Sequence, residues 1–467
     1  MDTSSAVSRR KPSVVPILCK GCGRCVASCA RHRISCGTEI NALTGLVPIA
    51  VDLANCNGCG LCIDACPEPF GLTAELAPPA RVETAHPCLP ALPDRTSTED
   101  IPDELIPLAA ARSLVVKGTY ASAIGALYAG CRHFFGYPIT PSTDGAELMA
   151  RLLPALDGHF VQAVSEIAAV NMMYGCGGAG QRAMTFTSSP GFSLMLEGIS
   201  YMIGAELPGV FVDVMRGGPG LGNIGPEQSD IKLACRGLGH GNTQALVLAP
   251  ATPQEMLDFT LLAFERSFHY RNPVVVLCDG FLGQMTGRVE LPATLVKPGL
   301  PGWAVNGDAA HRGNLICSIL LDAHDLERHN QHLDAKYARI AEREQRAELY
   351  ACDDADLLLV ACNTPARMAK GAVGSLRSAG VRAGLFRPQT LWPFPIDALR
   401  PLVGRTRRIV VVEASSGQLE DELRLALSHA ELRPPPIEHV RRAGGVLPQP
   451  AEIVERVRAG ASREVRP

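Results

Sequence analysis

Between residues 136 and 230 the chain carries three segments that decide the fold: GYPITPST (136–143), VSEIAA (164–169) and MRGGPG (215–220). The first follows the short, mostly apolar run 133–136 and contains two prolines, so it predicts a loop after a strand. In the second, Ser165 precedes Glu166 and a run of small and apolar residues, which is the pattern of a helix N-cap. The third follows 208–215, an apolar run typical of a parallel strand buried on both faces.

Each segment places one polar residue beside the end of a predicted strand: Thr140, Glu166 and Arg216. In open α/β sheets the ligand crevice lies outside the carboxyl ends of the strands, so we expect these three residues to converge on one cleft. Each also has a structural explanation. Thr140 can cap the next helix, and Glu166 in a first helical turn suits the helix dipole. The guanidinium of Arg216 suits a carboxylate ligand but equally a structural ion pair.

Taken together, the segments resemble the α subunit (the pyrimidine-binding domain) of the thiamine-diphosphate-dependent 2-oxoacid:ferredoxin oxidoreductases. The matching words are YPITPS (137–142), SEIAA (165–169), EGISY (197–201), AELP (205–208), MRGGPGLG (215–222) and PEQSD (226–230). The resemblance covers residues 111 to 460 and implies an α/β fold with doubly wound, mostly parallel sheets. It implies a pyrimidine-binding domain at 111–290 and a transketolase C-terminal-like domain at 351–460, joined by a linker and a charged, water-facing helix at 291–350.

Composition narrows the class of protein. The chain has 467 residues, which suits two or three domains, and a formal net charge of -3, which gives no reason to expect nucleic acid or a membrane as partner. No apolar run approaches the roughly 20 residues that span a bilayer. Seventeen cysteines in a long chain without a secretory segment indicate a reducing compartment and metal or redox use. We therefore expect a cytoplasmic protein.

Eight cysteines near the N-terminus repeat the spacing C-x2-C-x2-C-x3-C twice. In this spacing three thiolates surround one [4Fe-4S] cluster and the fourth belongs to the other cluster. We therefore assign Cys19, Cys22, Cys25 and Cys66 to one cluster and Cys56, Cys59, Cys62 and Cys29 to the second. Residues 14–75 thus resemble a bacterial two-cluster ferredoxin, a small α+β domain, although Ala30 replaces the usual Pro after Cys29. Two zinc sites are the alternative, but zinc motifs usually separate their cysteine pairs more widely.

The segments around these domains carry further expectations. Residues 76–110 are rich in Pro and Ala without sustained periodicity, which predicts a semi-rigid linker. A strand at 114–117, a helix at 119–129 and the strand before Thr140 are expected to start the doubly wound sheet as a βαβ unit. GCGGAG (175–180) fits a dinucleotide-binding pattern, but it lies inside or at the end of a helix, so close helix packing explains it better.

Thiamine diphosphate needs a site for Mg²⁺ and its diphosphate, usually Gly-Asp-Gly with a downstream Asn. The sequence contains no Gly-Asp-Gly, and Cys278-Asp279-Gly280 ends a strand without the downstream partner. In the family that half-site lies on the β subunit. The resemblance therefore implies an α subunit whose site is completed by a β subunit that largely holds thiamine diphosphate and Mg²⁺, with a γ subunit as a further expected partner.

The resemblance also implies roles for the three polar residues. Glu166 would hydrogen-bond N1′ of the aminopyrimidine of thiamine diphosphate, a task for a positioned carboxyl group. Arg216 would clamp the substrate carboxylate, and Thr140 would hydrogen-bond the substrate or an intermediate.

The expected function is oxidative decarboxylation of a 2-oxoacid to acyl-CoA and CO2, with coenzyme A as the acyl acceptor. The substrate is branched-chain, 2-oxoglutarate or aromatic such as phenylglyoxylate. Electrons would leave through the iron-sulfur clusters to ferredoxin or another acceptor. Two alternatives stay open: a redox adaptor subunit with a degenerate body, and a non-oxidative thiamine diphosphate decarboxylase subunit.

Overall fold

The computed structural model describes residues 11–42, 44–68, 71–74, 101–108 and 112–464. The chain divides into two compact units, Met1–Thr96 and Ser97–Pro467. Within the described residues no helix is both long enough and apolar enough to cross a membrane.

The N-terminal unit is a small α+β domain. Its elements are β1 (Pro12–Val14), α1 (Arg24–Ser28), β2 (Ile34–Cys36), β3 (Ile49–Val51), α2 (Leu61–Asp64) and β4 (Leu72–Ala74). The strands form two antiparallel pairs, β1 with β4 and β2 with β3. Its core combines the buried Cys25 and Cys62 with Ile34, Ile49 and Leu72. With so little apolar surface to bury, the unit has only a minimal core of its own.

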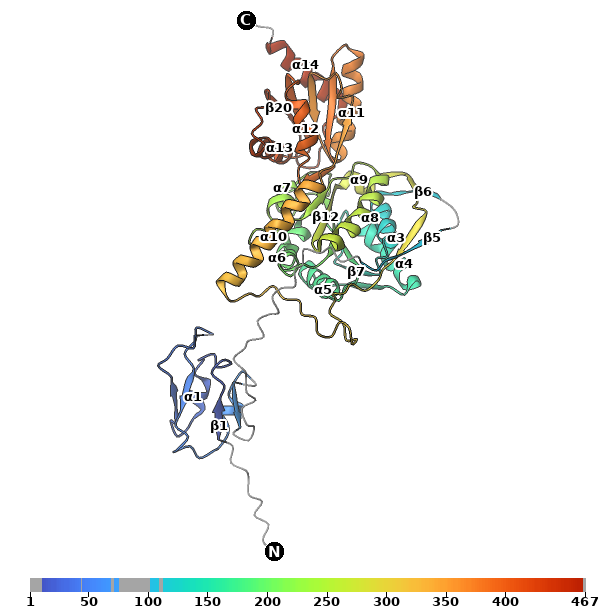
Figure 1. Cartoon of the computed structure of the whole chain (residues 1–467). Coiled ribbons are helices and arrows are strands. Elements are labelled where there is room, and N and C mark those ends of the chain that lie inside the picture. The colour runs from blue at the N-terminus through green and yellow to red at the C-terminus, as the bar shows by residue number, and fades with distance from the viewer. Residues whose placement is uncertain (1–10, 43, 69–70, 75–100, 109–111, 465–467) are drawn as a thin grey trace. The chain divides into compact units, whose positions relative to one another are not determined.

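A seven-stranded sheet organises the second unit, with the strand order β18-β11-β12-β10-β9-β7-β8. Figure 1 labels two of its strands, β7 and β12. Its strands are β7 (His133–Gly136), β8 (His159–Gln162), β9 (Ala183–Thr187), β10 (Gly209–Met215), β11 (Leu246–Leu248), β12 (Pro273–Asp279) and β18 (Thr390–Trp392). All are parallel except β18, which pairs antiparallel with β11. The expected α/β class with a mostly parallel sheet is confirmed.

Helices bury both faces of this sheet. Along β10, Phe211 and Met215 belong to one core cluster, whereas Val210, Val212 and Val214 belong to another, as the alternation of a strand requires. The first face is covered by α5 (Glu166–Gly178), α6 (Ser189–Gly204) and α7 (Ile231–Arg236), and the second by α3 (Gly118–Tyr128), α4 (Thr143–Leu152) and α8 (Pro253–Tyr270). The short η1 (Leu153–Leu156) follows α4, and α9 (Gly280–Gln284) follows β12.

The glycine-rich segment 175–180 lies at the end of α5, and its role is packing. A Cβ on Gly177 would lie 2.6 Å from the carbonyl oxygen of Pro208. The glycine therefore lets α5 approach the backbone before β10, as expected from its position inside a helix.

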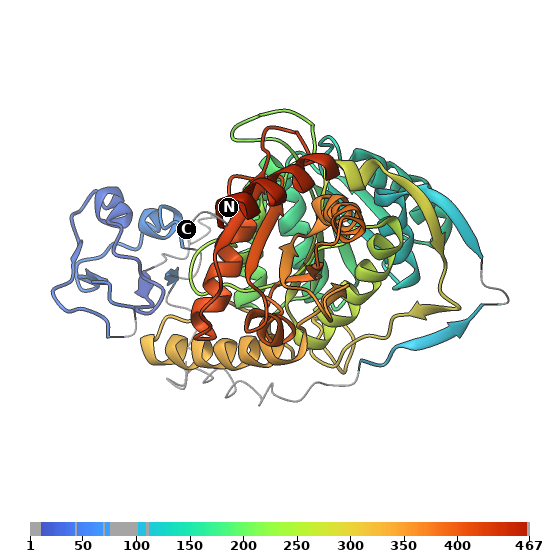
Figure 2. The ribbon, with the colours of Figure 1, turned by 90° about the horizontal axis from the view of Figure 1, so that it is seen from above.

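The expected βαβ start is wrong. Strand β6 (Ser113–Lys117) pairs antiparallel with β13 (Thr286–Glu290) and does not join the seven-stranded sheet. Its side chains are too exposed for a parallel strand, which needs two buried faces: Val115 is 72% exposed. The predicted linker also ends early, since β5 (Glu104–Pro107) pairs with β14 (Thr294–Lys297). Residues 76–100 and 109–110 of that linker lie outside the described residues. Figure 2 shows both two-stranded ribbons to one side of the main sheet.

The charged segment at 322–348 contains the long helix α10 (Ala323–Arg343), and the expectation that its charges simply face water is only partly correct. His329 and Lys336 are buried on the body. Lys336 Nζ lies 3.2 Å from Glu206 Oε1, and His332 Nε2 lies 2.9 Å from the same oxygen. These pairs dock one charged stripe of the helix against the turn that follows α6.

The C-terminal part of the second unit is a five-stranded sheet with the order β15-β17-β16-β19-β20. Its strands are β15 (Ala347–Tyr350), β16 (Leu357–Val360), β17 (Ala383–Pro388), β19 (Arg408–Glu413) and β20 (Ile437–Arg441). Its helices are α11 (Asn363–Ser378), α12 (Ile396–Val403), α13 (Gln418–His429) and α14 (Pro450–Glu464). Only β15 is antiparallel to its neighbour.

Arg387 joins this sheet to the body. Its guanidinium lies 2.5 Å from Glu255 Oε1 on α8 and 2.6 Å from Glu348 Oε2 on β15. The Arg387 side chain is buried, so both contacts act where water screens them little.

We predict that Arg387→Ala destabilises the second unit by about 3 kcal/mol, because it removes the buried cation that Glu255 and Glu348 share. The matched control Arg424→Ala removes a half-exposed i,i+4 pair with Glu420 and should cost less than about 1 kcal/mol. Denaturant unfolding followed by tryptophan fluorescence measures this, since both tryptophans, Trp303 and Trp392, lie in the second unit. Equal costs for the two variants would contradict the prediction.

Candidate functional site

The three polar residues singled out from the sequence lie at one edge of the seven-stranded sheet. Thr140 follows β7, Glu166 opens α5 after β8, and Arg216 follows β10. Because β7, β8 and β10 run parallel, their carboxyl ends share an edge.

Arg216 and Thr140 are in direct contact. Arg216 is 9% exposed, and its Nη1 donates to the carbonyl oxygen of Thr140 at 2.8 Å. Its Nη2 donates to the carbonyl oxygen of Leu221 at 3.3 Å, while its buried Nε has no partner among the described residues. The contact uses the backbone of Thr140 and not its hydroxyl. Arg216 thus ties the loop after β10 to the loop after β7 and leaves its Nε–H without a partner among the described residues.

Glu166 is held in a buried niche beside the first turn of α6. The hydroxyl of Ser165 accepts the Ala168 N–H at 3.3 Å, which fixes the start of α5 as the sequence predicts, and Glu166 is 5% exposed. A Cβ on Gly191 would lie 2.5 Å from Glu166 Oε1 and 2.4 Å from Thr187 Oγ1. Only a glycine at 191 therefore leaves room for this carboxylate.

Polar atoms in the Glu166 niche are left without partners. The hydroxyl of Thr187 is buried and makes no hydrogen bond with the described residues. Within the same described set, no hydrogen bond links Glu166 to Thr140 or Arg216. Buried polar groups are normally paired, so an unpartnered hydroxyl beside a buried carboxyl group suits a site that receives a polar ligand.

Ser189, in the first turn of α6, connects this niche to Arg216. Its hydroxyl accepts the Arg216 N–H at 3.0 Å and donates to Asp230 Oδ2 at 2.5 Å. Asp230 in turn faces the fully buried Asp213 of β10, and burial raises the pKa of both carboxyl groups. Two neighbouring carboxyl groups away from water disfavour each other's ionisation, and the fully buried Asp213 is the one held neutral.

The sequence reasoning missed Ser189, Gly191, Asp213 and Asp230. Asp213 gave the clearest signal, because it interrupts an apolar strand that is buried on both faces. The carboxylate of Asp279, by contrast, is occupied structurally: it accepts the N–H groups of Phe281 and Leu282 and the hydroxyl of Thr364.

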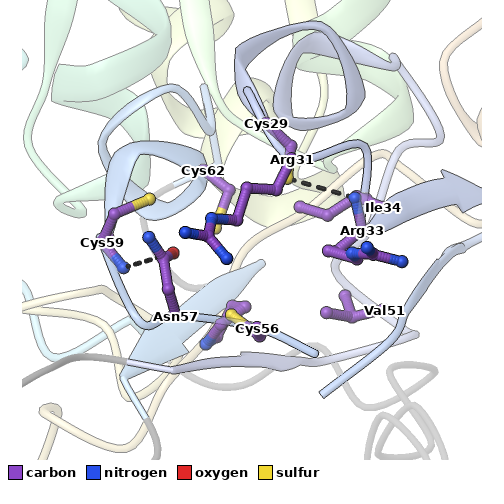
Figure 3. A pocket seen from close by; sticks show the side chains of 11 residues that line it. Cys29, Arg31, Arg33, Ile34, Val51, Cys56, Asn57, Cys59 and Cys62 are labelled. Carbon is purple, nitrogen blue, oxygen red and sulfur yellow. Dashed lines mark hydrogen bonds between the residues drawn. The ribbon is translucent and has the colours of Figure 1, made fainter. Parts of the chain in front are cut away.

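The eight N-terminal cysteines form two groups in space. Cys29, Cys56, Cys59 and Cys62 line one pocket (Figure 3), and Cys19, Cys22, Cys25 and Cys66 line another. These are the two sets expected from the spacing, each taking its fourth member from the other repeat.

The chemistry of both cysteine sets fits a thiolate-bound cluster. Burial raises the pKa of Cys25, and raises that of Cys62 to about 11, so these thiols become thiolates only beside a strong cation such as iron. In the described parts of the chain no three His, Cys, Asp or Glu side chains are placed to hold a single metal ion. The ligands of a single ion must lie closer together than the four cysteines around a four-iron cubane.

Three family models match the chain. Pyruvate flavodoxin/ferredoxin oxidoreductase, thiamine diP-bdg, matches residues 124–305, and the pyruvate:ferredoxin oxidoreductase core domain II matches residues 355–453. The 4Fe-4S dicluster domain matches residues 18–69. The expected thiamine diphosphate and [4Fe-4S] cofactors are thereby confirmed for these domains.

Similar proteins identify the family. The ketoisovalerate oxidoreductase subunit VorB of Methanothermobacter thermautotrophicus is 48% identical over 346 residues, which cover 74% of this chain and 97% of that protein. The chain belongs to the 2-oxoacid:ferredoxin oxidoreductase family. The 2-oxoglutarate synthase subunit KorA of Methanocaldococcus jannaschii is 34% identical over 368 residues, covering 72% of this chain and 97% of that protein. Both relatives are subunits, which implies partner subunits for this family member.

A solved structure of the family has the same fold. The 2-oxoglutarate:ferredoxin oxidoreductase from Magnetococcus marinus, with 2-oxoglutarate, coenzyme A and succinyl-CoA bound, is similar with a TM-score of 0.64 and 26% identity. The similarity covers 74% of this chain, which spans only 65% of the length of that solved chain.

We predict that Asp213→Asn flattens the pH dependence of stability. A carboxyl group whose folded pKa is raised contributes stability below its unfolded pKa, about 4, and loses it as pH rises toward the folded pKa. The amide introduced by the substitution cannot ionise, so the variant gains stability relative to the wild type between about pH 4 and pH 7. Denaturant titrations across this range measure the difference, with the exposed Asp421→Asn as control. Parallel wild-type and Asp213→Asn profiles would contradict a neutral Asp213.

Proposed function

We propose that this chain is the α-type subunit of an enzyme that oxidatively decarboxylates a branched-chain 2-oxoacid to acyl-CoA and CO2, with electrons leaving through its own iron-sulfur clusters. The observation that carries the proposal is the buried Glu166 carboxylate, which lies beside Gly191 and an unpartnered Thr187 hydroxyl on the same sheet edge as Arg216. The 48% identity to a ketoisovalerate oxidoreductase subunit, against 34% to a 2-oxoglutarate synthase subunit, favours the branched-chain substrate.

Each residue of the edge has a proposed task. Thiamine diphosphate, when bound, supplies the electron sink that lets the 2-oxoacid lose CO2. Glu166 holds a proton against the pyrimidine N1′ atom, which requires a carboxyl group fixed in place and shielded from water. The free Nε donor of Arg216 binds the substrate carboxylate, and Thr140, held through its carbonyl oxygen by Arg216, places its hydroxyl near the reacting carbonyl.

The residues of the loop after Arg216 are a further argument for a substrate with an apolar side chain. Leu221 and Ile224 follow the guanidinium and are 81% and 62% exposed. Exposed aliphatic side chains in the loop that follows the carboxylate clamp suit a branched alkyl group better than the second carboxylate of 2-oxoglutarate, whose burial needs a further cation.

A partner subunit accounts for other exposed side chains around this edge. Val164 lies just before α5 and is 88% exposed, and Ile167 on α5 and Leu194 on α6 are each about half-exposed. Exposed apolar side chains gathered around a site mark an interaction surface. We place there the β subunit that supplies the Mg²⁺ and diphosphate half of the site.

We predict that Glu166→Gln lowers 2-oxoacid-dependent dye reduction by at least about a hundredfold, because an amide cannot exchange the proton at N1′. The complex should assemble normally and keep its iron content. The control Glu147→Gln changes an exposed carboxylate on α4 and should leave turnover unchanged. Near wild-type turnover in Glu166→Gln would remove Glu166 from this role.

The wild-type complex distinguishes the alternative functions. CO2 release from a 2-oxoacid without dye reduction would indicate a non-oxidative decarboxylase. Iron-sulfur clusters without any 2-oxoacid-dependent reaction would indicate a redox adaptor.

We predict that Val164→Asp weakens association with the partner subunit at least about tenfold, since a charge would be buried at an apolar contact. Co-purification and sedimentation at known concentrations measure it. Leu321→Asp, at a 91% exposed position before α10, is the matched control and should associate normally. Unchanged association of Val164→Asp would place the partner elsewhere.

A further inference from the structure

The two cysteine pockets of the N-terminal unit differ in their hydrogen bonds to sulfur. In the pocket of Cys29, Cys56, Cys59 and Cys62, the N–H of Arg33 donates to Cys29 Sγ at 3.3 Å and that of Gly58 donates to Cys56 Sγ at 3.4 Å. Backbone N–H groups also stabilise the Cys25 thiolate of the other set and the Cys62 thiolate of this one, so among the described residues the bonds to Cys29 and Cys56 are what distinguishes the two sets.

The pockets also differ in charge. Lys20 and Glu68 both line the pocket of the Cys19 set, and they form an ion pair at 3.1 Å, so their charges offset each other. Arg31 and Arg33 line the pocket of the Cys56 set. Arg33 lies 3.6 Å from Asp52, whereas Arg31 has no carboxylate at ion-pair distance in the described part of the chain. One positive charge at the Cys56 set is therefore not offset.

The position of Arg31 brings this charge close to the sulfur atoms. Figure 3 shows its side chain reaching across the pocket between Cys29, Cys59 and Cys62, while the Arg33 side chain points away from these cysteines. Arg31 follows Cys29 by two residues. Ala30 lies between them, where the other repeat has a proline after Cys66.

Charge and hydrogen bonds act in the same direction on a reduction potential. A cluster becomes more negative by one charge when it gains an electron, so a nearby cation and N–H donors to its sulfur ligands stabilise the reduced state. Solvent and salt weaken the effect at the exposed Arg31 without reversing its sign.

We propose that Arg31 is a potential-setting residue, which raises the reduction potential of the cluster on Cys29, Cys56, Cys59 and Cys62 above that of the cluster on Cys19, Cys22, Cys25 and Cys66. When the two clusters share one electron, it then resides on the cluster of the Cys56 set. Its transfer oxidises the cluster of the Cys19 set and reduces the cluster of the Cys56 set, without any change in bonds or protons. This inference rests on the proposed assignment of the two ligand sets but not on the identity of the 2-oxoacid.

The test is an EPR-monitored dithionite titration of the complete complex with its iron and sulfide contents measured. The wild type should show two reduction waves. Arg31→Gln should lower the higher wave, shifting the distribution of the electron between the two sets by about tenfold, or about 59 mV for a one-electron couple. Arg31→Lys keeps the charge and should leave the wave near its wild-type value. Lys20→Gln, in the other pocket, should move only the lower wave.

Each outcome decides a different claim. Coincident wild-type waves, or an unshifted higher wave in Arg31→Gln at full iron content, would overturn the role of Arg31. A shift of the higher wave by Lys20→Gln would overturn the assignment of that wave to the Cys56 set. Wild-type protein with iron for fewer than two clusters would overturn the cluster assignment itself. If Arg31→Gln does not retain its clusters, the other two variants still test the proposal. Arg31→Lys should leave the higher wave in place, and Lys20→Gln should shift only the lower wave.

Discussion

A parallel sheet that is buried on both faces leaves only its strand ends for chemistry, and this constraint organises the second unit. The seven residues of β10 are all buried between two helical layers, so the first side chain able to meet a ligand is Arg216, directly after the strand. The same holds for Thr140 after β7 and for Glu166 after β8. The position of Glu166 is fixed by the helix that it opens, because the Ser165 hydroxyl caps α5 shortly after β8 ends.

The first turn of α6 joins the parts of this edge. Gly191 gives space to the Glu166 carboxylate, and Ser189 binds the backbone of Arg216 and the carboxyl group of Asp230. A substitution in this turn would therefore disturb the carboxylate niche at Gly191 or the backbone of Arg216 at Ser189. Such dense coupling explains why polar side chains are tolerated here inside an otherwise apolar layer.

Local patterns predicted the strands, the Ser165 cap and the cysteine sets, because each depends on residues near in sequence. Tertiary contacts decided the rest. The run at 114–117 has strand composition, but its pairing with β13 and its exposure are set by residues far along the chain. Lys336 belongs to a charged helix, yet it is buried because it forms an ion pair with the buried Glu206. The proximity of Asp213 and Asp230 likewise depends on how the loop after β10 folds back.

The fusion of a two-cluster unit to an α-type body places electron exit on the same chain as half of the proposed active site. The most direct test is anaerobic reduction of a viologen dye by the co-purified complex with thiamine diphosphate, Mg²⁺ and coenzyme A, comparing 2-oxoisovalerate with 2-oxoglutarate. We expect coenzyme A-dependent dye reduction, with kcat/KM at least about tenfold higher for 2-oxoisovalerate. Failure of every 2-oxoacid to reduce the dye, in a complex that binds thiamine diphosphate and contains its clusters, would contradict it.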